Sequence, residues 1–324
     1  MTGDKLAGLD AKAKKELLRR NHRKNRIRMT TEDRIYQIVI YLLVTIITLL
    51  CLIPLIYVIG MSFTSLMELN EKNNFVLIPM HPTLESYKYI LKQANLYTGF
   101  LVSVFRTVFG VMAMLVFVVP GGYILAKHEL PGRRGILLFF VITMLIQGGT
   151  IPSYMLIKSL KLLDSIWVYV VPAFGSVYNM LIIKIFVEGM PQDIIESADL
   201  DGATELQKMF YIAIPLLVPT ICALSLFTGV AQWNAWFDSL LYVKTVSKQP
   251  VQLLIHQLFN RTVASTNMDG AGNMQSMISD LYRAGTDITI KMACVVIAML
   301  PIMCVYPFLQ KYFIFGMYTG SVKG

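Results

Sequence analysis

Charged residues are scarce in this chain. Only 15% of its 324 residues carry a charge, whereas roughly a quarter do so in ordinary soluble proteins. Hydrophobic residues make up 55% of the sequence, and its mean hydropathy is +0.58. A soluble core of this length could not bury that much apolar surface, so lipid must be the solvent for much of the chain.

Motifs of soluble enzymes and secreted proteins are absent as well. The sequence contains no Gly-x-x-x-x-Gly-Lys-Ser/Thr, so the chain cannot obtain energy from ATP by itself. No catalytic constellation is present, and the four histidines lie too far apart for metal-ligand spacing: His22, His81, His128 and His256. We therefore expect a protein that is not an enzyme and that binds no cofactor or metal.

Cysteines are few, and the N-terminus is not apolar. All four cysteines fall within or beside apolar runs, where buried thiols are a better interpretation than disulfides or metal ligands: Cys51, Cys222, Cys294 and Cys304. The first 30 residues are basic, so nothing in them resembles the apolar core of a cleavable signal peptide.

Long uncharged runs, by contrast, are abundant. A helix needs about 20 apolar residues to cross the hydrocarbon of a bilayer, and it satisfies its own backbone hydrogen bonds there. The runs between flanking charges are 35–67 (apolar to about Met61), 107–126, 135–157, 165–183, 209–237 and 292–310. We predict an all-α integral membrane protein with six transmembrane helices, of which the fifth begins near Pro219.

Positive charge is concentrated before the first run. Residues 1–34 contain eleven Lys/Arg and five Asp/Glu, which gives +6 of the total net charge of +9. Such a segment favours the cytoplasmic side, as does the basic loop 127–134. We therefore predict that both termini are cytoplasmic, with a basic tail over 1–34 and a transmembrane domain over 35–324. The tail is either a surface helix on anionic lipid or a disordered charged segment.

A polar segment of mixed charge separates the fourth and fifth runs. It begins Glu196-Ser197-Ala198-Asp199-Leu200-Asp201-Gly202 and closes with Ile212-Ala213-Ile214-Pro215. A calcium loop is a poor interpretation, because the glycine comes too early and the later ligands are absent. A helix-turn-helix over 197–205 is also disfavoured, because apolar spans on both sides leave no room for a DNA-binding domain. An ordinary cytoplasmic loop is the simplest alternative.

The spacing of this segment resembles a family signature. The pattern Glu-Ala-Ala, three residues, Gly, nine residues, Ile-x-Leu-Pro is the signature loop of permease subunits of ABC importers. This chain matches it in register, with Ser197 in place of Ala and Ile214 in place of Leu. Further stretches are similar to the carbohydrate-uptake (maltose-type, type I importer) permeases: 127–133, Trp233-Asn234, 310–313 and 320–324. Residues 148–152 are similar to a branch associated with oligosaccharides.

That resemblance implies a cytoplasmic coupling segment over 188–218. Its first arm would run from Glu188 to Ala198, Glu196 would contact an ATPase subunit, and Gly202 would make the turn. The residues implied in ATPase coupling are Glu196, Ser197, Ala198, Asp199, Asp201, Gly202, Ala203, Ile212 and Pro215.

The resemblance also implies partners. These are a second permease subunit in a pseudo-symmetric heterodimer, two ABC ATPase subunits that bind ATP and Mg²⁺, and an extracytoplasmic solute-binding protein. The chain would contact membrane lipid but no nucleic acid. Its location would be the bacterial cytoplasmic membrane, which it crosses several times.

The substrate path carries fewer signals. Ionisable and amide groups inside a span are costly and are functional candidates for that reason. The candidates lie near the end of the fifth run among aromatic residues, which suits sugar binding but also an interfacial aromatic belt: Gln232, Trp233, Asn234 and Asp238. Arg106 and Lys184 are expected to snorkel, with Lys184 reaching the cytoplasmic side.

Taken with the resemblance, these features predict the transmembrane subunit of an ATP-driven importer that moves a carbohydrate, an oligosaccharide, by alternating access. Two alternatives stay open at this point. One is an ABC importer permease for a non-sugar solute such as phosphate, metal or peptide. The other is an uncoupled membrane channel or receptor that uses the polar segment as an adaptor site.

Overall fold

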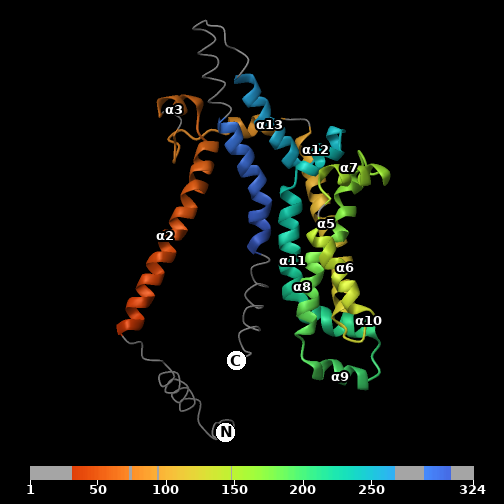
Figure 1. The fold of residues 1–324 in the computed structure, drawn as a ribbon. Helices are drawn as coiled ribbons and strands as arrows, with labels where there is room; N and C mark the ends of the chain where they lie inside the picture. Colours follow the sequence, from red (N-terminus) through yellow and green to blue (C-terminus); the bar gives the residue numbers. More distant parts are fainter. Residues whose placement is uncertain (1–30, 73–74, 93–94, 147, 267–287, 308–324) are drawn as a thin grey trace, which may run out of the picture. The chain divides into compact units, whose positions relative to one another are not determined.

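The computed structural model of the protein describes residues 31–72, 75–92, 95–146, 148–266 and 288–307, and every regular element in these ranges is helical (Figure 1). The longest helices are α2 (Thr31–Ser62), α5 (Leu96–Ala126), α11 (Ile214–Asn234) and a helix at Ile288–Pro307. Helices of intermediate length are α6 (Arg133–Leu145), α7 (Thr150–Ser159), α8 (Val177–Glu188), α9 (Gln192–Leu200) and α13 (Val251–Thr266).

Short elements join these helices. The α-helical ones are α3 (Leu66–Glu71), α4 (Glu85–Leu91), α10 (Glu205–Gln207) and α12 (Phe237–Tyr242). The others are the 3₁₀ turns η2 (Ile166–Tyr169), η3 (Val171–Gly175) and η5 (Val246–Lys248), and a π-helix, η4 (Lys208–Ala213). The predicted all-α class is therefore confirmed for the described part of the chain.

The chain divides into two compact units, residues 1–56 and 57–324. The described part of the first unit is α2 up to Ile56, and the most apolar 18-residue window of α2 has a mean hydropathy of 2.9. A helix this apolar on every face needs lipid or protein around it. The predicted basic tail lies outside the described residues except for 31–34, which open α2. The contacts reported below lie within the second unit.

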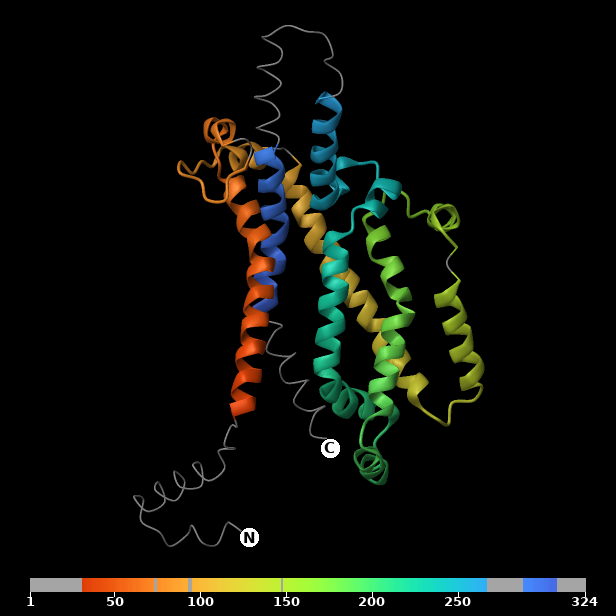
Figure 2. The same cartoon turned by 60° about the vertical axis from the view of Figure 1, so that its left-hand side comes forward.

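The second unit is built on α5, α8 and α11, which run side by side (Figures 1 and 2). Met114, Met180, Ile183 and Leu217 lie in their shared core, each at most 2% exposed. The helices α5 and α8 approach closely at Gly122, where an added Cβ would lie 2.6 Å from the Ile183 side chain and 2.8 Å from the Met180 carbonyl oxygen. Small residues permit such close approach between membrane helices.

Between four and six segments of the described residues are suited to crossing a bilayer. Four helices are long and apolar enough by themselves: α2, α5, the continuous helix Glu205–Asn234 and the helix Ile288–Pro307. Two bent pairs add up to two more spans. The axes of α6 and α7 differ by 113°, and the turns over Ile166–Gly175 meet α8 at 42°. The chain is a multi-pass membrane protein.

The third predicted run, 135–157, is not one straight helix. Its first part is α6, which ends at Leu145, and its second part is α7. Gly149, with φ +82° and ψ −177°, is the N-cap of α7, and glycine adopts this positive-φ backbone conformation without strain.

The starts of the second and fifth helices also differ from prediction. Helix α5 begins at Leu96 rather than after Arg106, because the Arg106 guanidinium finds partners inside the bundle. The fifth span begins at Glu205, so Pro219 lies inside α11 rather than at its start. A capping motif just before Glu205 explains that early start.

The bundle has two ends that differ in chemistry (Figure 1). The helix α9 and the loop 127–132 lie at one end, named here the α9 end. Helices α7, α12 and α13 lie at the other, named the α12 end, and the predicted loop 244–287 thus contains α13. The stretches 310–313 and 320–324, which contributed to the family resemblance, lie outside the described residues.

Candidate coupling segment and membrane cavity

The polar segment folds as a short helix closed by a left-handed turn. Gly202 has φ +74°, and its N–H donates to the Asp199 carbonyl oxygen at 3.1 Å. The Ala203 N–H donates to the Ala198 carbonyl oxygen at 3.0 Å. These bonds are the 5→2 and 6→1 contacts of a Schellman motif, which places a residue in the left-handed region directly after the helix. Gly202 thus makes the turn, because this position needs a positive φ that glycine adopts without strain.

The first arm is shorter than predicted. Helix α8 already ends at Glu188, and α9 begins only after Pro191, which is its N-cap. The proline preceding α9 fixes the direction of the chain, because its ring locks φ near −65°. Glu188 therefore belongs to the membrane helix, and the arm that leaves the bundle is α9 alone.

The return to the membrane begins with a capping box. The Gln207 side chain accepts the Thr204 N–H at 2.8 Å, and the Thr204 hydroxyl accepts the Gln207 N–H at 3.4 Å. The helix continues through the π-helix η4 into α11, and Pro215, which has no N–H to donate, follows directly on that irregular turn. Ile212 and Pro215 therefore lie inside this long helix rather than in a loop.

Helix α9 presents both exposed and covered side chains. Glu196, Ser197 and Asp201 are exposed, and Leu200 is 90% exposed. Ala198 is only 8% exposed, so this chain itself covers most of it. Leu200 and Ile194, which is 40% exposed, therefore give α9 exposed apolar surface beside its polar side chains.

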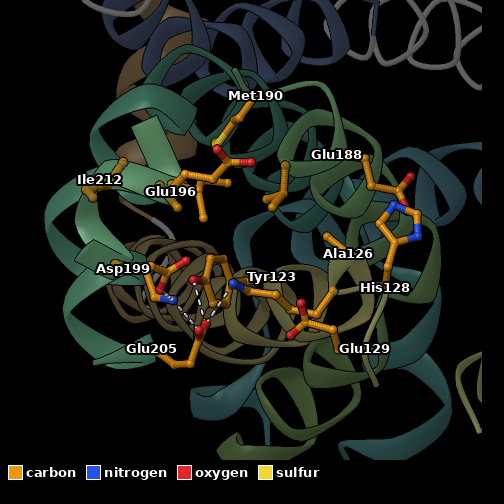
Figure 3. Close-up of a pocket in the computed structure, with 15 residues that line it drawn as sticks. Tyr123, Ala126, His128, Glu129, Glu188, Met190, Glu196, Asp199, Glu205 and Ile212 are labelled. Carbon is orange, nitrogen blue, oxygen red and sulfur yellow. Dashed lines mark hydrogen bonds and ion pairs between the residues drawn. The ribbon is translucent and has the colours of Figure 1, made fainter. Parts of the chain in front are cut away.

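A row of ion pairs ties this segment to the membrane helices (Figure 3). Lys208 is 6% exposed, and its ammonium pairs with the carboxylates of Asp199 on α9 and Glu205 on α10. Glu205 also accepts the Lys127 ammonium at 2.9 Å and the Tyr123 hydroxyl at 3.0 Å. Charges alternate along the row Asp199, Lys208, Glu205, Lys127. The buried Lys208 and the partly buried Lys127 thus each have an opposite charge beside them, while the carboxylates of Asp199 and Glu205 are more than half exposed.

The far end of this row stays charged. Partial burial disfavours the ammonium form of Lys127, but the Glu205 carboxylate and the Tyr123 ring beside it favour that form more strongly, so the pKa of Lys127 is raised. Its ammonium also lies 5.1 Å from the centroid of the Tyr123 ring. Lys127 therefore remains a cation at any physiological pH.

A cavity of about 470 Å³ lies between α9 and the ends of α5 and α8 (Figure 3). Its lining combines carboxylates with apolar side chains: Glu129, Glu188, Glu196, Met190, Ile195 and Ile212. Glu188 pairs with Arg133 and, at 2.9 Å, with Lys184. Within the described ranges, no group of three or more His, Cys, Asp or Glu side chains is arranged to hold a metal ion.

Arg106 does not snorkel to the membrane surface, so that prediction is wrong. Its side chain is 1% exposed and donates to the Asp238 carboxylate at 2.6 and 3.3 Å and to the Ala235 carbonyl oxygen at 2.9 Å. It also donates to Gln232 Oε1 at 3.2 Å and lies 4.5 Å from the centroid of the Tyr169 ring. The break between α11 and α12 supplies these acceptors within the bundle, which removes any reason for the side chain to reach water.

A larger, open cavity of about 810 Å³ lies beside this cluster. The structure brings three of the four predicted substrate-path residues into its lining: Gln232, Asn234 and Asp238. Aromatic side chains complete it, namely Tyr178, Phe227, Trp236 and Phe237.

Trp233 lies elsewhere. It is 5% exposed, its indole N–H donates to the Ala298 carbonyl oxygen at 3.0 Å, and its ring meets Phe100 edge to face. It lines a separate apolar cavity of about 440 Å³ between α5, α11 and the helix Ile288–Pro307.

Sequence reasoning missed Lys208 and Glu205. Neither is among the candidate residues predicted from the sequence, and a separation of nine positions between Asp199 and Lys208 does not by itself place the two on one face. The spacing of Thr204 and Gln207 could have been recognised as a helix start. It would have put both residues in the first turns of the fifth span.

The comparisons with known proteins cover almost the whole chain, although no protein-family model matches it. The polygalacturonan/rhamnogalacturonan transport system permease protein YtcP of Bacillus subtilis is 37% identical over 90% of this chain and 100% of its own length. Protein LplC of the same organism is 38% identical over 84% of this chain and 90% of its own length. The crystal structure of a bacterial ABC transporter involved in the import of the acidic polysaccharide alginate matches with a TM-score of 0.72 and 28% identity, covering 88% of this chain and 99% of that chain.

A multi-pass helical bundle with an exposed polar helix at one end has the architecture of a membrane transport permease. The extent of the identity makes the assignment specific. The chain belongs to the family of permease subunits of carbohydrate ABC importers.

Proposed function

We propose that this chain is the transmembrane subunit of an ATP-driven importer that moves an oligosaccharide by alternating access. The observation that carries the proposal is α9, a short polar helix at one end of the bundle with Glu196 and Leu200 exposed. Membership of the permease family supports the transport activity.

The exposed side of α9 is the proposed contact with the ATPase. The sequence has no nucleotide-binding motif, so ATP and Mg²⁺ would be bound by two separate ATPase subunits and no cofactor by this chain. Burying the exposed Leu200 in a partner would contribute about 1.5–3 kcal/mol, and Glu196, Ser197 and Asp201 offer polar contacts beside it. Ala198 is covered by this chain, and Asp199, whose side chain is 53% exposed, pairs with Lys208, so both would support α9.

The positive-inside rule supports an orientation with the α9 end in the cytoplasm. Counting each bent pair as one span, α6 with α7 and the turns over Ile166–Gly175 with α8, gives six crossings, an even number that would leave both termini on the cytoplasmic side. A second permease subunit would complete the path, and a solute-binding protein would deliver the cargo at the α12 end. The membrane would be the cell membrane of a bacterium.

The cavity of about 810 Å³ is the proposed part of the substrate path in this chain. Relatives named for polygalacturonan and rhamnogalacturonan transport, and a similar structure involved in alginate import, support a polysaccharide-derived cargo. Gln232, Asn234 and Asp238 would hydrogen-bond sugar hydroxyls, while Trp236 offers an aromatic face to a sugar ring. Trp233 would act on this path indirectly, through helix packing.

Uptake by the purified transporter tests the proposal. The chain is isolated with its co-purifying subunits, reconstituted in lipid vesicles and offered a panel of oligosaccharides with and without ATP. We expect ATP-dependent uptake of at least one oligosaccharide. We also expect Glu196→Ala and Leu200→Ala each to weaken ATPase binding about tenfold, as the loss of about 1.4 kcal/mol implies.

Glu129→Ala is the matched control, because Glu129 is an exposed glutamate at the same end but outside α9. ATPase binding and uptake should stay at wild-type values in this variant. Unchanged uptake in the Glu196 and Leu200 variants would refute the coupling role of α9. Uptake that needs no ATP would instead support an uncoupled channel.

A further inference from the structure

Lys208 carries its charge where an ammonium group is not expected. Its side chain is 6% exposed, and two carboxylates hold it, Asp199 from α9 and Glu205 from α10. An ammonium that is taken out of water needs such partners, because an unpaired buried charge is strongly destabilising. The two carboxylates therefore fix the position of Lys208, and Lys208 fixes theirs.

The same row of charges reaches the membrane helices. Glu205 contacts both Lys127, directly after α5, and Tyr123 in the last turns of α5. Lys208 itself opens η4, which continues into α11. Side-chain contacts therefore connect α9 to the ends of two core helices, α5 and α11.

These contacts matter because the backbone links of α9 are short and contain glycine. Residues 189–191 join it to α8, and residues 201–204 join it to α10. Gly202 lies in the second link and Gly189 in the first, where Pro191 restrains only its own φ, and glycine permits large changes of backbone angle at low cost. A force applied to α9 by a partner would be absorbed in these two links unless side chains fasten the helix to the bundle.

We propose that the row Asp199, Lys208, Glu205 and Lys127 is a latch that makes α9 move together with α5 and α11. It rests on the proposed function, since the force comes from an ATPase docked on α9. In this role Lys208 and Glu205 are positioning residues that act through α9. Breaking the latch leaves the ATPase bound but separates ATP hydrolysis from movement of the membrane helices.

The test compares Lys208→Met with the wild type in the assembled transporter in lipid vesicles. Hydrogen exchange of the α9 amides and the number of substrate molecules moved per ATP hydrolysed are measured. Exchange over α9 should become at least about tenfold faster, because charge-assisted contacts are lost. Transport per ATP should fall several-fold while the ATPase subunits remain bound. Lys208→Arg keeps a cation between the two carboxylates and should restore most of both quantities.

Lys184→Met is the matched control. Lys184 is also mostly buried at the α9 end and pairs with Glu188, but Glu188 keeps Arg133 when the lysine is removed. Both measured quantities should stay at wild-type values in this variant. The latch is wrong if Lys208→Met leaves both quantities unchanged, or if Lys184→Met alters them equally. If Lys208→Met does not reach the membrane, the same two quantities are measured in Asp199→Asn, which keeps the lysine and removes one carboxylate charge. The same changes are expected.

Failure of the latch and failure of the proposed function give different results. If Glu196→Ala and Leu200→Ala weaken ATPase binding while Lys208→Met transports normally per ATP, only the latch is refuted. If the Glu196 and Leu200 variants bind ATPase and transport normally, the coupling role of α9 fails, and the latch fails with it.

Discussion

The ion pair between Arg106 and Asp238 allows a quantitative test of how the bundle is held together. Arg106→Met keeps much of the apolar volume of the side chain but removes the guanidinium. The Ala235 carbonyl oxygen and Asp238 Oδ2 then lose this donor, while Asp238 Oδ1 keeps the Ser239 N–H. Removing one partner of a buried pair costs about 3–5 kcal/mol. The Asp238 side chain is 33% exposed, so water compensates part of the loss, and we expect the lower end, about 3 kcal/mol.

Thermal unfolding in detergent measures this loss. A change of 1 kcal/mol shifts Tm by about 2–4 °C in domains of 150–250 residues, so Arg106→Met should lower Tm by about 6–12 °C. All variants are heated at one fixed rate, because unfolding of large proteins is often irreversible. Lys244→Met, which removes an exposed lysine at the same end of the bundle, should change stability by less than about 0.5 kcal/mol.

A double-mutant cycle isolates the pair itself. Asp238→Leu alone leaves the Arg106 cation buried without its carboxylate, and it should be at least as costly as Arg106→Met. The double variant carries neither charge, so its loss should be smaller than the sum of the single losses by about 2 kcal/mol or more. Losses that add within about 0.5 kcal/mol would refute the reasoning, because the two side chains would then act independently.

Three further outcomes are expected. Gly122→Ala should push α5 and α8 apart and cost about 1–3 kcal/mol in the same thermal assay. Gly202→Ala places a Cβ at φ +74° and should cost about 1–2 kcal/mol locally, seen as faster hydrogen exchange over α9. The Met80 N–H and the Lys72 ammonium hold the pKa of Glu68 at about 2, below its usual 4.5. The Tm difference between wild type and Glu68→Gln should therefore be constant above about pH 5 and shrink as the pH falls through 4.5 toward 2; a difference that persists at low pH would contradict this.

The features of the fold that could be predicted from the sequence depend on composition and on the spacing of neighbouring residues. The scarcity of charge and the length of the apolar runs are properties of the chain itself, so the helical membrane class followed from them. The position of the polar segment and its left-handed turn also depend on neighbouring residues alone. Gly202 is a case in point, since a Schellman motif is completed within six residues.

The features that could not be predicted from the sequence depend on contacts between residues far apart in the chain. An isolated arginine in lipid is costly, so the sequence predicts that Arg106 bounds a span, but its partner Asp238 lies 132 positions away. The burial of Lys208 depends likewise on how α9 folds back onto α10. Neither contact produces a periodic pattern in the sequence. Where a charged side chain is paired inside the bundle, a prediction that starts each span after the last charge therefore places the start of the helix too late.

Helix α5 takes part in both the membrane cavity and the latch. Arg106 beside the cavity and Tyr123 at the latch are seventeen residues apart on this one helix, which corresponds to about 26 Å along its axis. One residue inserted between them would rotate one side chain about 100° against the other, as well as displacing it by about 1.5 Å. The length of α5 between these two positions therefore sets the rotational angle between the side chains at the cavity and those at the proposed latch, whereas the loops at either end of the bundle can change length without altering that angle.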